Sequence, residues 1–245
     1  MKFNIAVLID GDNAQPKLIQ AIIEEVSKYG KATIRRIYGD WTIPQMNGWK
    51  EVINQYSFSP VQKFAYTSGK NSTDSSLIID AMDILHSKNV DGFCIVSSDS
   101  DYTGLAKRIR EGGIFVMGIG QKKTPVAFVQ SCEIFTYTEN ISASVEEDTE
   151  GPLKEKAIRA VKKNTINTKV IDKAFDISIN EDEEAYVANI GSNLRKIDPS
   201  FDPRAFGFKT LTQLFESLPK YEVIKNNVNG LNHPLVKRKQ RTKRT

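Results

Sequence analysis

Aspartates stand at three points of this sequence where carboxylates could work together. Two pairs directly follow short apolar runs and one acid opens a predicted helix: Asp10 with Asp12, Asp99 with Asp101, and Asp74. Parallel strands of a doubly wound sheet end at a common edge, and ligands bind there. We therefore expect acids from these three points to converge at one edge of a sheet.

Carboxylates crowded together repel one another, and a divalent cation removes that cost. The sequence has only two histidines, and its two cysteines lack a zinc-binding spacing, so oxygen atoms must hold any metal. Mg²⁺ prefers oxygen ligands and is commonly held by one or two carboxylates and a substrate phosphate. Such an ion can activate water and orient a phosphodiester. The acids thus predict a magnesium-type site that acts on phosphate esters.

Most of these acids also have a purely structural explanation. Asp74 could be a favourable charge at a helix N-terminus, and Asp101 could cap the helix that begins at Tyr102. Asp12 could simply form a turn with Gly11. Asp10 is harder to explain in this way, because a charge at the end of an apolar strand needs a partner.

Strand and helix patterns alternate through the first 141 residues. Apolar runs predict strands at residues 3–9, 32–38, 61–66, 92–97, 114–119 and 134–137. Helical spacing predicts intervening helices at residues 16–26, 45–56, 73–86, 102–110 and 125–130. This alternation is typical of an α/β domain in which a mainly parallel sheet is flanked by helices.

The pattern changes after residue 141. Residues 142–152 are small and acidic and predict a linker, and residues 237–245 form a basic tail. Between them, residues 153–236 predict a second domain, with helices at 153–163, 186–196 and 211–218 and a hairpin turn at Asn229-Gly230. Three helices closed by a hairpin are typical of a small winged helix-turn-helix domain.

Positive charge gathers in the second half of the chain. The formal net charge is +4, and residues 151–245 contain 19 basic and 11 acidic side chains. A basic tail after a compact domain indicates a polyanionic partner, although a solvated end without a specific role would have the same composition.

No segment predicts a membrane or export function. The longest apolar runs fall well short of the roughly 18 residues that a membrane helix requires, and Asp10 interrupts the first run before it reaches the length of a signal peptide. We therefore expect a cytoplasmic protein without a membrane partner, with Cys94 as a buried thiol in a strand. Homodimerisation is compatible with the sequence, but no heptad pattern predicts it.

Several motifs follow one another in order through the first domain: Ile9-Asp10-Gly11-Asp12-Asn13, Lys70-Asn71-Ser72-Thr73-Asp74, Val96-Ser97-Ser98-Asp99-Ser100-Asp101-Tyr102, Gly118-Ile119-Gly120 and Gln121-Lys122-Lys123-Thr124-Pro125. In combination they resemble the NYN family, a branch of the PIN-like nucleases that includes the LabA-type proteins. The resemblance implies a PIN-like fold and RNA cleavage that depends on Mg²⁺ or Mn²⁺. It also implies a catalytic and metal-binding set, with Asn13 in support of the metal or the phosphate: Asp10, Asp74, Asp99 and Asp101.

The second domain resembles the LOTUS domain, also called OST-HTH. The matching residues are Gly191 to Lys196, Pro199 to Arg204 and Phe206 to Leu211. The resemblance implies RNA binding by a winged-helix fold. The upstream segment 175–184 is more acidic than this family pattern, which puts RNA contacts there in doubt.

The leading hypothesis is therefore a ribonuclease whose second domain and basic residues hold RNA through its phosphates. Candidate contacts are Arg35, Arg36, Lys70, Lys122, Lys123 and Lys209. A non-catalytic RNA-binding adaptor with a vestigial site would have the same sequence features. A haloacid dehalogenase-type phosphatase is disfavoured because Ala14 stands where that family has Thr or Val. Rossmann-type dinucleotide binding lacks its glycine motif.

Overall fold

The computed structural model describes residues 3–64, 72–146, 166–228 and 231–239. The chain divides into two compact units, Met1–Thr149 and Glu150–Thr245. The predicted helix at residues 153–163, Lys70 and most of the predicted basic tail lie outside the described residues. Among the described helices, none has the length and apolar character needed to span a membrane.

The first unit is built on a six-stranded parallel sheet with the order β3-β2-β1-β4-β5-β6. Its strands are β1 (Phe3–Asp10), β2 (Gly30–Gly39), β3 (Ser59–Gln62), β4 (Gly92–Val96), β5 (Phe115–Gly120) and β6 (Ile134–Tyr137). The strand order reverses between β1 and β4, which are direct neighbours. In open parallel sheets this reversal opens a crevice at the carboxyl ends of the two strands.

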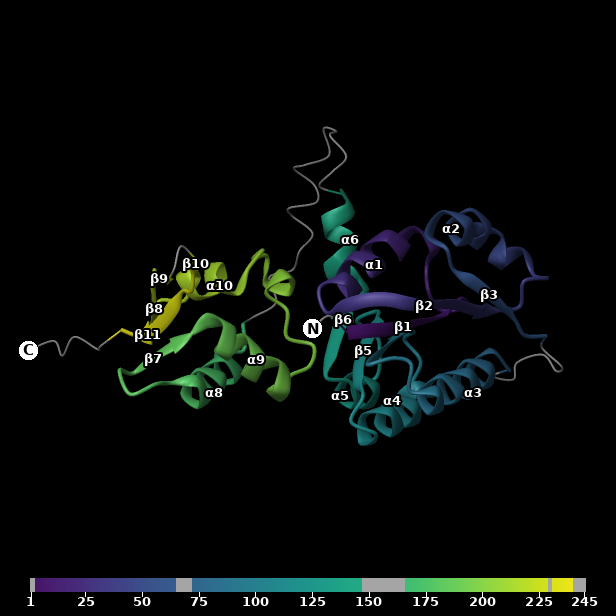
Figure 1. The fold of residues 1–245 in the computed structure, drawn as a ribbon. Helices are drawn as coiled ribbons and strands as arrows, with labels where there is room; N and C mark the ends of the chain where they lie inside the picture. The colour runs from purple at the N-terminus through teal and green to yellow at the C-terminus, as the bar shows by residue number, and fades with distance from the viewer. Residues whose placement is uncertain (1–2, 65–71, 147–165, 229–230, 240–245) are drawn as a thin grey trace, which may run out of the picture. The chain divides into compact units, whose positions relative to one another are not determined.

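Helices cover both faces of this sheet (Figure 1). The helical segments are η1 (Pro16–Leu18), α1 (Ile19–Ser27), η2 (Pro44–Gly48), α2 (Trp49–Tyr56), α3 (Ser72–Ser87), α4 (Tyr102–Glu111), α5 (Val126–Ser131) and α6 (Thr138–Glu146). One apolar cluster joins one face to α3, α4 and α5, and a second joins the other face to α1, α2 and α6.

The alternation of side chains along β1 decides where its terminal acid lies. Ile5, Val7 and Ile9 belong to the cluster on the α1 side, whereas Ala6 and Leu8 belong to the cluster on the α3 side. All five are fully buried, as expected for a central parallel strand. With a period of two, Asp10 falls on the α3 side.

The second unit is a winged helix-turn-helix. Its elements are α8 (Thr168–Ser178), β7 (Glu184–Tyr186), α9 (Val187–Ile197), η3 (Pro203–Phe206), α10 (Leu211–Ser217), β8 (Tyr221–Ile224), β9 (Asn227–Val228), β10 (Leu231–Asn232) and β11 (Leu235–Arg238). The helices pack around Ile171, Phe175, Ile190 and Leu214. An antiparallel sheet with the order β7-β11-β8 closes the unit.

The predicted fold class is confirmed for both units, with local differences. The predicted helix at residues 45–56 opens as the 3₁₀ segment η2, whose first residue is Pro44. Helix α6 runs to Glu146, so part of the expected linker is helical. Helix α8 was not predicted, although Ile171, Ala174 and Phe175 have helical spacing and Asn167 caps the N-terminus through its side chain.

Candidate functional site

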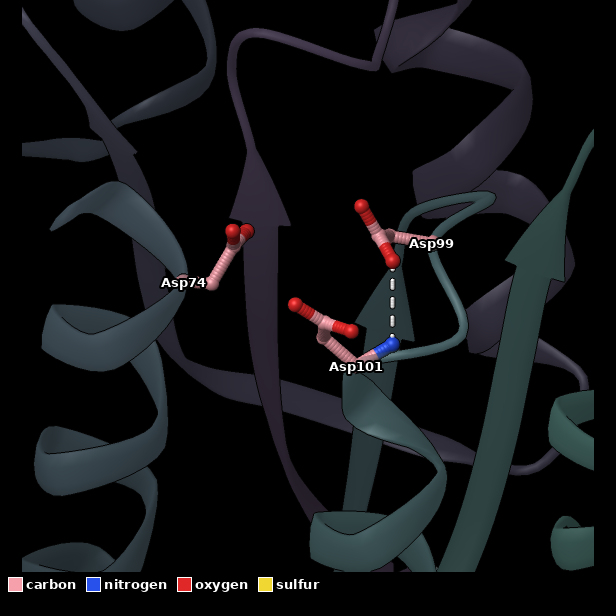
Figure 2. A group of neighbouring side chains, drawn as sticks. All are labelled: Asp74, Asp99 and Asp101. Atoms are coloured by element: carbon pink, nitrogen blue, oxygen red, sulfur yellow. Dashed lines mark hydrogen bonds between the residues drawn. The ribbon is translucent and has the colours of Figure 1, made fainter. Parts of the chain in front are cut away.

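Three of the four predicted aspartates meet at the carboxyl edge of the sheet. Asp74 lies in the first turn of α3, Asp99 lies in the loop after β4, and Asp101 directly precedes α4. One carboxylate oxygen from each lies within 4.8 Å of the others, and the side chains point into a common space (Figure 2). Asp74 and Asp99 are half-buried and Asp101 is exposed, so the group is open to a ligand from solvent.

Hydrogen bonds between residues two positions apart hold the loop between β4 and α4 in place. The Asp99 N–H donates to the Ser97 hydroxyl at 3.1 Å, and the Asp101 N–H donates to Asp99 Oδ1 at 2.9 Å (Figure 2). Asp101 stands at the N-cap position of α4, but its side chain makes no capping hydrogen bond. The alternative explanation of Asp101 as a helix cap is therefore wrong.

A buried tyrosine holds the carboxylate of Asp74 in position. The hydroxyl of Tyr102, a fully buried residue, donates to Asp74 Oδ1 at 2.7 Å. Burial raises the pKa of the Asp74 carboxyl, the Tyr102 hydrogen bond opposes this, and the charges of Asp99 and Asp101 raise the pKa further. The cluster thus makes ionisation of Asp74 costly in the absence of a cation.

Asp10 lies beside this group and is fully buried at the end of β1. Its Oδ2 accepts hydrogen bonds from the Ser97 hydroxyl at 2.8 Å and from the Asn13 amide at 2.7 Å, and Oδ1 accepts the Asp12 N–H at 3.2 Å. Burial raises the pKa of Asp10, the bonds from Asn13 and Ser97 counteract this, and the charge of Asp74 raises it again. Asp10 therefore belongs to the same electrostatic site without being one of the three converging carboxylates.

Two of the predicted RNA contacts, Arg35 and Arg36, interact with other groups of the first unit. Arg36 forms an ion pair with Asp80, which also accepts the Tyr38 hydroxyl. Arg35 donates to the carbonyls of Ala32 and Tyr56. Both guanidiniums are engaged within the unit, so the prediction that they contact RNA has no support from the structure.

The predicted lysine contacts that the structure describes lie at its surface. Lys122 and Lys123 are exposed in the loop after β5, and a carboxylate oxygen of Glu139 accepts the Lys122 N–H at 2.9 Å. Lys209 is exposed in the second unit, and its N–H donates to the side chain of Gln213. Asn13 orients Asp10, which is a positioning contact.

Sequence reasoning missed two positioning residues, Ser97 and Tyr102. Both residues lie in the motif that runs from Val96 to Tyr102, but the sequence pattern assigned no function to their hydroxyl groups. A signal existed for Ser97: it follows β4, the strand that pairs with β1, and so had to end close to Asp10. No comparable signal identified the Tyr102 hydroxyl, because its contact with α3 depends on how two helices pack.

The donor set fits a hard divalent cation. All of the converging ligand atoms are carboxylate oxygens, which Mg²⁺ and Mn²⁺ prefer. Among the described residues, Asp10 and Asp74 accept hydrogen bonds from hydroxyl, amide and backbone groups, and neither is paired with a lysine or arginine. The carboxylates that could hold an ion are Asp74, Asp99 and Asp101, with Asp10 next to them.

Comparison with known families agrees with this architecture. The NYN domain family matches residues 4–142, more than half of the chain, and the chain belongs to this nuclease-type family. The OST-HTH/LOTUS domain family, an RNA-binding type, matches residues 153–233. The protein thus joins an NYN domain to an OST-HTH/LOTUS domain.

Comparison with individual proteins adds little. No curated protein matches the chain. A crystal structure of a protein of unknown function from Vibrio parahaemolyticus is similar, with 19% sequence identity and a TM-score of 0.46 over 55% of this chain and 91% of that one.

Proposed function

We propose that this protein is a metal-dependent ribonuclease that hydrolyses RNA phosphodiester bonds at its aspartate cluster. The observation that carries the proposal is the convergence of Asp74, Asp99 and Asp101 within 4.8 Å at the sheet edge, in a chain of the NYN family. The raised pKa values of Asp74 and Asp10 support it, because they mark a site that lacks positive charge.

Each acid has a defined part in this proposal. Asp74, Asp99 and Asp101 would hold Mg²⁺ or Mn²⁺ at the edge of the sheet, where the scissile phosphate would bind. Asp10 adds negative charge from its buried position, and Ser97 and Asn13 keep its carboxylate turned toward the site. A bound divalent cation supplies the positive charge that polarises the phosphate and makes water more acidic.

RNA is held by the second unit and by surface lysines. The OST-HTH/LOTUS match supports residues 153–236 as the RNA-binding domain. In the first unit, Lys122 and Lys123 offer charge beside the loop that carries the acids, because β5 and β4 are neighbouring strands. Such contacts are electrostatic, so binding should weaken steeply as the salt concentration rises.

Cleavage of labelled RNA tests the proposal. Wild type, Asp10→Asn and Asp99→Asn are incubated with single-stranded and structured RNAs in Mg²⁺, Mn²⁺ or EDTA, and folding is checked by circular dichroism. Asp83→Asn is the matched control, since Asp83 is an exposed acid of α3 outside the cluster. We expect cleavage by wild type and the control only with metal, and none by the site variants. RNA binding without cleavage by folded wild type would instead establish the adaptor hypothesis.

A further inference from the structure

A wide hollow lies between α2 and the edge strand β3 of the first unit (Figure 1). Its volume is about 560 Å³, and it is largely open to solvent. The exposed part of its lining is mostly apolar, and the residues that form it are Trp41, Lys50, Ile53, Asn54, Pro60 and Gln62. The hollow is therefore an open apolar surface that suits a flat ligand.

The indole ring of Trp41 is held in place at one side of this hollow. Its Nε1–H donates to the Val61 carbonyl at 3.0 Å, and the backbone N–H of Trp41 donates to Gln62 Oε1 at 2.9 Å. Gln62 Nε2 donates in turn to Asp40 Oδ1 at 2.9 Å, which ties the loop after β2 to β3. The one polar group of the half-buried ring is thus already paired. What the ring offers to the hollow is apolar surface with a π-face.

The charge of the lining favours an anionic ligand. Among the residues that line the hollow, Lys50 is the only charged one. Its side chain is exposed, and no acid in the described part of the chain forms an ion pair with it. An aromatic ring beside a basic group is the combination that binds single-stranded nucleic acid, because bases stack on the ring and phosphates pair with the cation.

The hollow opens at the same edge of the sheet as the acid cluster. Trp41 follows the carboxyl end of β2 and Gln62 ends β3, whereas Asp10 ends β1, and the strand order is β3-β2-β1. Neighbouring strands lie about 5 Å apart, so β3 and β1 are separated by about 10 Å. The hollow is on the α2 side of the sheet and Asp10 is on the α3 side. An RNA strand with one phosphate at the acids can therefore cross the end of β2 and bring a nearby base to Trp41.

We infer that Trp41 and Lys50 form a stacking site for one unpaired base of the RNA, a short distance along the strand from the cut. The base stacks on the indole ring, and Lys50 pairs with the adjoining phosphate. A base inside a duplex already stacks on its neighbours, so the site selects single-stranded RNA. It discriminates little among the bases, because every base has a π-face. The inference rests on the proposed nuclease function for the identity of the ligand.

The fluorescence of Trp41 tests this contact directly. A short single-stranded RNA is titrated into the full chain in EDTA, which withholds the metal and so prevents cleavage. Stacking on Trp41 should quench part of the wild-type fluorescence, whereas Trp49, the other tryptophan, is fully buried and should not respond. Trp41→Phe keeps an aromatic ring and should bind RNA within a few-fold of wild type without the quench. No quench in wild type at high RNA concentration, or the same quench in Trp41→Phe, would overturn the inference.

Affinity and kinetics separate the stacking site from the acid cluster. Trp41→Leu keeps an apolar side chain without the ring and should weaken binding of single-stranded RNA by about tenfold, and Lys50→Gln should weaken it a few-fold. The matched control Lys107→Gln changes an exposed lysine of α4, which covers the opposite face of the sheet, and should bind like wild type.

In cleavage assays, both variants of the stacking site should raise KM and leave kcat unchanged, because they remove binding that the substrate and the transition state share. Circular dichroism checks that each variant is folded. Wild-type affinity in folded Trp41→Leu would refute the stacking site. A Trp41 quench in a wild-type protein that never cleaves RNA would instead refute only the nuclease function.

Discussion

Carboxylates that are at least partly buried have opposite kinds of partner in the two units of this protein. In the second unit, burial acts to raise the pKa of Asp172, but hydrogen bonds from Lys220, at 2.6 Å, and from Tyr221 outweigh it and leave the pKa lowered. In the first unit, the pKa values of Asp10 and Asp74 stay raised because hydroxyl and amide donors do not offset burial and neighbouring acids.

This contrast distinguishes an aspartate that stabilises the fold through an ion pair from aspartates whose arrangement suits the binding of a cation. Asp172 receives its cation from the chain itself, through Lys220. Asp74 shares its space with two further acids and is bonded to the neutral hydroxyl of Tyr102. A fold keeps such an arrangement at a cost in stability, and a divalent cation would remove that cost.

The largest effect should come from the converging acids. Asp74→Asn and Asp101→Asn should each lower the rate of RNA cleavage on the order of 100-fold or more, because each removes a charge that holds the cation at the phosphate. Initial rates with labelled RNA at saturating Mn²⁺ measure this. Near-normal rates in both variants, with Asp83→Asn as the reference, would place the chemistry elsewhere.

Metal should stabilise the first unit and leave the second unchanged. A cation at about one hundred times its dissociation constant adds about 2.7 kcal/mol to the free energy of unfolding. We expect Mn²⁺ to raise the unfolding temperature of wild type, EDTA to reverse the rise, and Asp99→Asn to abolish it. Differential scanning calorimetry measures these shifts. An equal rise in Asp99→Asn would show that the ion binds at another place.

The lowered pKa of Asp172 predicts that its substitution has a smaller, pH-dependent effect on the stability of the second unit. Asp172→Asn should destabilise the second unit by about 1 kcal/mol at neutral pH, since the ion pair with Lys220 is partly exposed. The folded pKa of Asp172 lies below its ordinary value of 3.8, so its stabilisation is present above pH 3.8 and is lost as the pH falls through the folded pKa. Urea unfolding across this range checks the sign, and Asp182→Asn, an exposed acid of the same unit, should show no such loss.

The smallest effect should come from the surface lysines. Lys122→Ala and Lys123→Ala should each weaken RNA binding only a few-fold, and each should reduce the slope of log affinity against log salt by about 0.7. Lys31→Ala, an exposed lysine at the amino end of β2 and thus at the opposite edge of the sheet, serves as the control. Equal slopes in all three variants would show that the loop after β5 does not contact RNA.

The sheet of the first unit and the location of its acidic site could be predicted from the sequence, because the aspartates stand directly at or after the ends of predicted strands. Asp10 ends β1 and Asp99 follows β4, and the register of these paired strands brings the two acids to one edge. The partners of Arg36 could not be read in this way. Its ion pair with Asp80 joins β2 to α3 over 44 positions, and only the packing of the helix on the sheet brings the two together. A basic residue in a sequence predicts charge, but not whether an internal acid already binds it.

The same limit applies to the second unit. The spacing of Ile171 and Phe175 was helical, yet the acids that follow them concealed α8 as part of a polar segment. The chain that follows the predicted turn at Asn229-Gly230 forms two short strands, of which β10 pairs with β9 and β11 pairs with β7 and β8. Pairing partners of short antiparallel strands depend on tertiary contacts, which sequence alternation does not contain.

Direct titration of Mn²⁺ into the metal-free protein is the sharpest test of the contrast between the two units. By calorimetry, we predict saturable binding to wild type and to Asp172→Asn, and loss of that binding in Asp99→Asn although the variant remains folded. Binding of the same strength and stoichiometry in Asp99→Asn, or no binding to folded wild type, would contradict the proposal that the aspartate cluster is a metal site.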